Sequence, residues 1–183
     1  EEQRRVVEAQ MAVADDHDLP AILHTPTRLT STDRYRPELG RPGYEQNVEL
    51  AQAPVYDAAN PELDAVKEDV AAADRAGLPE SRIVASHADP NNVAYLMEET
   101  DCHASFTVGA PWLTGVDAAT VAEAIHEYGP DRIMIDTDCA NVLRSDPFAL
   151  KRAVLELYRL GVDEDAIRTV VAENPRTMFG LDS

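Results

Sequence analysis

The order of hydrophobic and polar residues along the chain shows two patterns: a helical period in some segments, and short continuous apolar runs typical of buried strands in others. Apolar residues recur every three to four positions in five segments, which predicts amphipathic helices at residues 2–16, 63–76, 91–100, 117–128 and 146–160. Four short apolar runs between them predict strands at residues 21–23, 82–86, 103–108 and 133–135. A helix followed by four strand–helix units indicates a parallel sheet with right-handed crossovers.

Four strand–helix units correspond to half of a TIM barrel. A complete (β/α)8 barrel typically needs about 250 residues, whereas the chain has 183 and begins with Glu1 rather than Met. We therefore expect an α/β fold made of the parallel (β/α) units of a TIM barrel, a half barrel truncated at its amino terminus. Residues 1–183 should form this single partial domain, with a loop insertion at about residues 27–61 that serves as a lid or is disordered.

The charge of the chain restricts its partners. It has 34 acidic and 16 basic side chains, a formal net charge of −18, and the acids are spread over the predicted helices. The negative charges of such a surface repel one another unless salt screens them, so we expect a halophilic, cytoplasmic protein. No basic patch is present to release counterions from a phosphate backbone, so strong generic nucleic-acid binding is not expected.

Two further features of the sequence bear on its class. No apolar run is long enough to span a bilayer, so no membrane partner is expected. Cys102 and Cys139 form no CxxC pair, and we expect both to be small buried residues in a reducing compartment.

Potential metal ligands follow three of the four predicted strands: His24, His87 and Asp138. Because the carboxyl ends of parallel strands meet at one edge of a sheet, we expect these side chains to converge. Imidazole and carboxylate groups bind Zn, Mn or Mg in hydrolytic sites. Such an ion lowers the pKa of water, and a carboxylate can accept the proton. We predict a divalent-metal site in which Asp138 is both ligand and catalytic base, while Asp136 hydrogen-bonds to a ligand or to the sheet.

The same residues have simpler explanations when they are considered one at a time. A single histidine at a strand end usually has a structural role, and either aspartate could cap the next loop or helix. The joint placement at three strand ends is what favours a metal site.

Four short segments, in the right order, carry a resemblance to a known family: PAILHTP, RIVASHADPNNV, DRIMIDTDCAN and ENPRTMFGL. They resemble the carboxyl-terminal half of the TatD-related metal-dependent TIM-barrel hydrolases, in an archaeal branch of the amidohydrolase superfamily. The resemblance covers most of residues 1–28 and 62–182. It implies that His24, His87 and Asp138 are metal ligands. The H-x-H pair of the family's first strand and the acidic ligand of its fourth strand are not present in the chain, and TDCAN differs from the family's usual sequence after the last strand.

The predicted function is hydrolysis by a metal-activated water. The family resemblance implies a phosphoester, nuclease-like substrate, whereas the acidic surface favours a small molecule with an ester or amide bond. Arg28, beside the insertion, is a candidate to bind an anionic group, and Trp112 is a candidate wall of the pocket. A surface ion pair for Arg28 and simple packing for Trp112 are the open alternatives.

A hypothesis of another class is a non-catalytic barrel-derived binding or structural domain, or an inactive fragment that lacks the H-x-H ligands. A half barrel leaves two sheet edges and an apolar face uncovered. We therefore expect a homodimer or a separate amino-terminal half to cover them.

Overall fold

The structure is a computed structural model that describes residues 2–24, 61–109, 116–138 and 146–181. Almost all of the predicted insertion at about residues 27–61 lies outside these residues, as do Arg28, Trp112 and Cys139. Within the described part of the chain, no helix is both long and apolar enough to cross a membrane.

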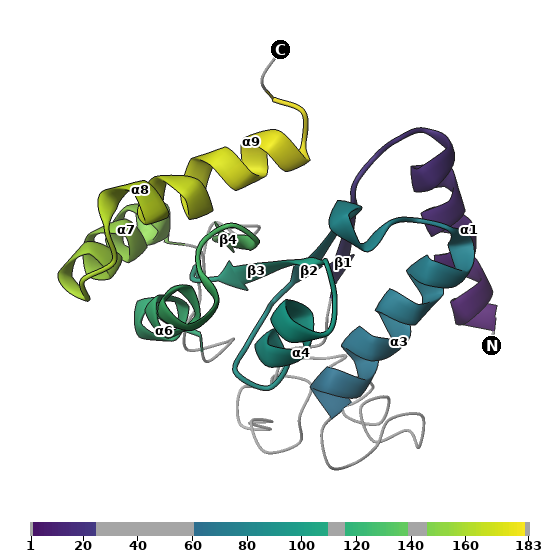
Figure 1. The fold of residues 1–183 in the computed structure, drawn as a ribbon, viewed down its shortest axis with the longest axis horizontal. Helices are drawn as coiled ribbons and strands as arrows, with labels where there is room; N and C mark the ends of the chain where they lie inside the picture. The colour runs from purple at the N-terminus through teal and green to yellow at the C-terminus, as the bar shows by residue number, and fades with distance from the viewer. Residues whose placement is uncertain (1, 25–60, 110–115, 139–145, 182–183) are drawn as a thin grey trace, which may run out of the picture.

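A parallel four-stranded sheet forms the centre of the domain (Figure 1). Its strands are β1 (Ala21–His24), β2 (Ile83–Ser86), β3 (His103–Thr107) and β4 (Ile133–Asp136). Their order in the sheet is β1-β2-β3-β4, and each pairs in parallel with the next. Strands alternate with helices, so the predicted α/β fold of parallel strand–helix units is confirmed. This sequential order is the one that neighbouring strands have in a (β/α)8 barrel, whereas doubly wound sheets reverse theirs.

The helices flank the sheet in chain order (Figure 1). They are α1 (Glu2–Asp16), α3 (Pro61–Ala76), α4 (Val93–Glu98), α6 (Ala118–Tyr128), α7 (Ala149–Arg159), α8 (Glu164–Arg168) and α9 (Asn174–Met178). A 3₁₀ turn, η4 (Glu80–Arg82), precedes β2, and a π-helical turn, η5 (Thr169–Glu173), joins α8 to α9. Helix α1 packs against α3, α4 against β3, and α6 against α7, while η5 and α9 contact β4.

The start of α7 differs from the prediction by a few residues. Asp146 and Pro147 were expected to begin this helix, but it begins at Ala149. The Asp146 carboxylate accepts a hydrogen bond from the backbone N–H of Phe148, at 2.9 Å, and so stabilises a turn before the helix.

The two faces of the sheet differ in polarity because side chains alternate along each strand. One face joins the hydrophobic core of the helices through rows of paired residues: Leu23, Ala85, Ala104 and Ile133 in one row, and Phe106 and Ile135 in the next. On the opposite face, the polar residues nearest the carboxyl ends are His24, Ser86, Ser105, Thr107 and Asp136, with the buried Met134 beside Ser105. The register of the strands therefore gathers polar groups at the edge of the sheet where the sequence predicts a site.

Arg132 connects the start of β4 to the end of α4. Its guanidinium donates hydrogen bonds to four carbonyl oxygens: those of Met97 (2.6 Å), Thr100 (2.7 Å), Cys102 (2.9 Å) and Leu96 (3.2 Å). The last carbonyls of a helix have no partner inside it, so one side chain here satisfies the end of α4 and the connection to β3.

Asn174 ties the terminal helices to the same strand. Its amide nitrogen donates to the carbonyl oxygens of Pro130 (2.8 Å) and Ile133 (2.7 Å). Part of the ENPRTMFGL segment thus has a structural role, because it anchors α9 at the start of β4.

The Arg132 contacts give a first prediction. Arg132→Met keeps the apolar length of the side chain but leaves four carbonyls without their charged donor, so we expect the free energy of unfolding to fall by about 2–4 kcal/mol. Guanidinium denaturation in high salt measures this value. Arg168→Met is the matched control, since the exposed guanidinium of Arg168 pairs with Asp165 at the surface, at 3.1 Å, and its loss should change stability by less than about 0.5 kcal/mol. Equal effects of the two substitutions would contradict the role of Arg132.

Candidate functional site

Two of the three predicted metal ligands lie in direct contact. His24 is the last residue of β1, and His87 follows the end of β2 on the neighbouring strand. Nε2 of His87 lies 3.2 Å from Nδ1 of His24, and the rings are nearly perpendicular, at 87° with centroids 4.6 Å apart. His87 is only 6% exposed, whereas His24 is exposed. One imidazole is therefore embedded in the sheet edge, and the other faces solvent.

The third predicted ligand, Asp138, is exposed two residues beyond β4. Within the described residues, no group of three or more His, Cys, Asp or Glu side chains is arranged to hold a metal ion. Asp138 is nevertheless close enough to act on His87 through its charge. Burial and the neighbouring His24 lower the pKa of His87, and the carboxylates of Asp136 and Asp138 partly oppose this shift. The role of Asp138 as ligand and base stays a prediction.

Asp136, the last residue of β4, hydrogen-bonds to the neighbouring strand β3, which is one of the two roles predicted for it. Its Oδ2 accepts a hydrogen bond from the Ser105 hydroxyl (2.7 Å), and its Oδ1 accepts one from the Thr107 hydroxyl (2.8 Å). The Thr107 oxygen also lies 2.9 Å from Nδ1 of His87. Hydrogen bonds thus run without a break from Asp136 on β4, through Thr107 on β3, to the histidine pair.

Left-handed backbone conformations mark the same strand ends. His87 has φ 61° and Asp138 has φ 44°, and Asp18 is the only other non-glycine residue with positive φ in the part of the chain described. This conformation costs about 1–3 kcal/mol for such residues and concentrates at functional sites. Two of the three predicted ligands therefore carry backbone strain that their surroundings must hold in place.

Gly109 fixes the distance between the ends of β3 and β4. A β-carbon at this position would overlap the carbonyl oxygen of Thr137, the residue between Asp136 and Asp138. Only glycine permits this close approach of the two backbones, which sets the position of both carboxylates relative to Thr107.

Asp69, on α3, is a site neighbour that sequence reasoning missed. It is half-buried, and burial, assisted by the charge of Glu68, raises its pKa to about 6, while the charge of His24 acts in the opposite direction. No periodicity signals this residue, because it sits directly before the buried Val70 at the margin of the apolar face of α3. Ser105 and Thr107 were also missed, although their spacing of two in HASFT places both on one face of β3.

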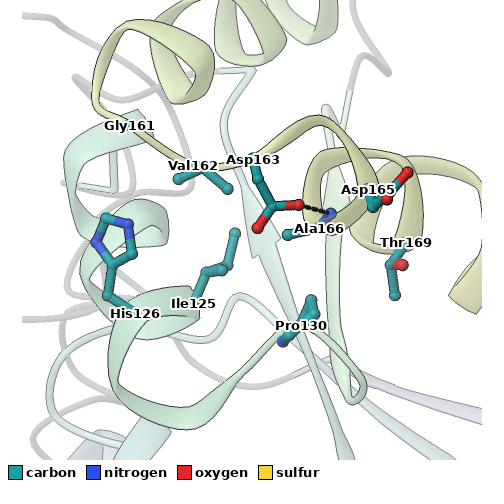
Figure 2. A pocket seen from close by; sticks show the side chains of 9 residues that line it. All are labelled: Ile125, His126, Pro130, Gly161, Val162, Asp163, Asp165, Ala166 and Thr169. Carbon is teal, nitrogen blue, oxygen red and sulfur yellow. Dashed lines mark hydrogen bonds between the residues drawn. The ribbon is translucent and has the colours of Figure 1, made fainter.

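A separate hollow lies near the amino-terminal end of β4 and is lined by α6, the turn before α8, and α8 itself (Figure 2). His126 borders this hollow, as do Asp163 and Asp165. The Asp163 carboxylate is engaged as the N-cap of α8, where it accepts a hydrogen bond from the backbone N–H of Ala166 at 2.9 Å. The hollow borders Pro130, at the opposite end of β4 from Asp138, so it does not belong to the histidine site.

Cys102 has the buried position predicted for it. Burial raises the pKa of its thiol to about 11, which keeps it protonated.

Comparisons of the chain with protein-family models, with curated proteins and with solved structures find no match. The structure shows an α/β domain with a four-stranded parallel sheet. The resemblance to TatD-related hydrolases stays a prediction from the four sequence segments.

The raised pKa of Asp69 predicts a pH-dependent gain in stability for Asp69→Asn. The folded chain holds a proton on Asp69 more tightly than the unfolded chain, so the carboxylate lowers stability fully above about pH 6 and progressively less as the pH falls toward 4. After allowance for partial solvent exposure, we expect the substitution to raise the free energy of unfolding by about 1 kcal/mol at pH 8 and by less at pH 5. Chemical denaturation of metal-free protein at both pH values measures this.

Asp74→Asn removes an exposed carboxylate from the same helix and serves as the control. Its effect should stay within about 0.5 kcal/mol and should not depend on pH in this way. A loss of stability in Asp69→Asn at pH 8 would show that the Asp69 carboxylate is stabilising.

Proposed function

We propose that the chain is a metal-dependent hydrolase domain, related to the TatD group, that holds a divalent ion at His24 and His87 with Asp138 as a further ligand. One observation carries this proposal. Two imidazole nitrogens lie 3.2 Å apart at the carboxyl ends of adjacent parallel strands, which is where α/β barrels place their chemistry.

Two nitrogen donors of the site have the spacing expected for two ligands of one zinc ion. Two nitrogens that are each about 2.0–2.1 Å from a tetrahedral zinc lie about 3.3–3.4 Å from one another, and the separation of Nε2 and Nδ1 is 3.2 Å. Imidazole nitrogen favours zinc over manganese and magnesium, which prefer oxygen ligands. The exposed position of His24 leaves the pair open to solvent.

A bound ion at this pair would supply positive charge that polarises the substrate and acidifies water. The two aspartates near the pair would then have different roles. Both oxygens of Asp136 accept hydrogen bonds from Ser105 and Thr107, so this carboxylate is committed to holding the sheet and His87. Asp138 is exposed beyond the strand and acts electrostatically on His87, so it is the carboxylate available to accept a proton.

We propose a small molecule with an ester, amide or phosphoester bond as the substrate, with Arg28 and Trp112 as binding residues. The net charge of −18 disfavours a nucleic-acid backbone. The negative charges of Asp69, Asp136 and Asp138 around the histidine pair also disfavour a phosphate backbone. The same charge supports our proposal of a salt-adapted cytoplasmic protein.

A metal-binding domain without turnover is the second candidate. It is favoured by the ligand count, because the described residues bring together two imidazoles and no third ligand. The two candidates agree on zinc binding and differ in hydrolysis.

Both candidate functions require zinc binding at the histidine pair, and this predicts the behaviour of two histidine variants. Calorimetric titration with zinc, in high salt, should show about one ion per chain, and His24→Ala and His87→Ala should each weaken binding at least tenfold, because each removes a nitrogen donor. His126→Ala is the control, since His126 is exposed on α6 away from the pair, and should bind zinc as the wild type does. Circular dichroism checks that the variants fold. Equal zinc affinity in all four proteins would remove the proposed site.

Activity separates the two candidates. Zinc-loaded wild-type protein should hydrolyse p-nitrophenyl acetate or bis-p-nitrophenyl phosphate, and Asp138→Asn should abolish that turnover because the acceptor of the proton is lost. Tight zinc binding at the histidine pair without hydrolysis of either compound would favour the binding domain.

A further inference from the structure

Thr107 occupies a position through which Asp136 can act on His87. Thr107 and Asp136 are register partners on β3 and β4, and Thr107 is 1% exposed. Its hydroxyl donates to Oδ1 of Asp136 at 2.8 Å, and its oxygen is 2.9 Å from Nδ1 of His87. Both distances are those of well-formed hydrogen bonds.

The direction of these bonds fixes the proton on His87. A hydroxyl group has one proton to donate, and a carboxylate can only accept, so the proton of Thr107 is given to Asp136. The contact with His87 can then form only if Nδ1 of the ring carries a hydrogen and donates it to the Thr107 oxygen. In the neutral ring, the lone pair is left on Nε2, the atom that faces Nδ1 of His24 at 3.2 Å.

We propose that Thr107 is a positioning residue that holds His87 in the Nδ1–H tautomer and directs the lone pair of Nε2 toward His24. Asp136 is the anchor of this arrangement rather than a ligand. The inference deepens the proposed function, because the tautomer that Thr107 selects is the one in which both nitrogens of the close pair can bind one ion.

Three features make the arrangement rigid. Ser105 binds the second oxygen of Asp136 and so prevents the carboxylate from rotating away from Thr107. The side chain of Thr107 is β-branched and restricted about χ1. His87 is 6% exposed, so little water can compete for Nδ1. A serine at position 107 could make the same bonds, whereas a valine of nearly the same shape could not.

The first test is the tautomer of His87 in metal-free protein at pH 8, read from long-range proton–nitrogen spectra of the ring. The wild type should show Nδ1–H, Thr107→Ser should match it, and Thr107→Val should shift the ring toward Nε2–H. A role limited to packing would leave the valine variant unchanged. An Nε2–H ring in the wild type, or an unchanged tautomer in Thr107→Val, would overturn the proposal.

Zinc titration is the second readout. Thr107→Val should weaken zinc binding about 10- to 100-fold, as loss of a residue that orients a ligand does, and Thr107→Ser should stay within about threefold of the wild type. Equal zinc affinity of the valine variant and the wild type would overturn the proposal. Absence of zinc binding in the wild type would instead reject the proposed function, and the spectra of metal-free protein would still decide the role of Thr107.

Asp136→Asn provides a second variant in case Thr107→Val does not fold. With Ser105 still donating to the oxygen of the amide, the amide nitrogen faces Thr107 and donates to its oxygen, which frees the hydroxyl proton for Nδ1 of His87. We therefore expect His87 to change to the Nε2–H tautomer in this variant. An unchanged Nδ1–H ring would contradict the claim that the Asp136 carboxylate sets the tautomer of His87 through Thr107.

Discussion

The hydrogen bond between Thr107 and Asp136 joins β3 to β4 beneath the histidine pair, and the rest of the arrangement depends on it. It sets the direction in which Thr107 can bond and thereby fixes the ring of His87, which in turn faces His24 at 3.2 Å. The parallel order of the strands makes this possible, because it brings residues from β1, β2, β3 and β4 to one edge of the sheet. Each strand contributes one step of a single polar connection.

Contacts outside the polar face hold β3 and β4 in place. Arg132 and Asn174 hold the start of β4 by their bonds to backbone carbonyls, and Gly109 allows the ends of β3 and β4 to approach closely. The left-handed backbone at His87 and Asp138 persists only if such contacts outweigh its cost. Stability of the sheet and geometry of the candidate site are therefore linked through the same residues.

The sequence was sufficient for the parallel strand–helix fold and for the position of three potential ligands at strand ends, but not for the contacts around them. Apolar periodicity predicted the four strands and their parallel order, and placed His24, His87 and Asp138 at strand ends. Periodicity says which face a residue occupies, yet it carries no information on ring orientation or proton position, so the contact between Thr107 and His87 could not be foreseen. Asp69 was missed because its raised pKa arises from burial between elements distant in sequence. The tie from Asn174 to Ile133 also depends on packing between elements far apart in the chain.

X-ray absorption spectroscopy of the zinc-loaded wild-type chain would show whether His24 and His87 bind the same ion, because it identifies the atoms around the ion. We predict two imidazole nitrogens in the coordination shell, with oxygen in the remaining positions, and one imidazole fewer in His87→Ala. A shell of oxygen atoms alone, or a spectrum that does not change in His87→Ala, would contradict it.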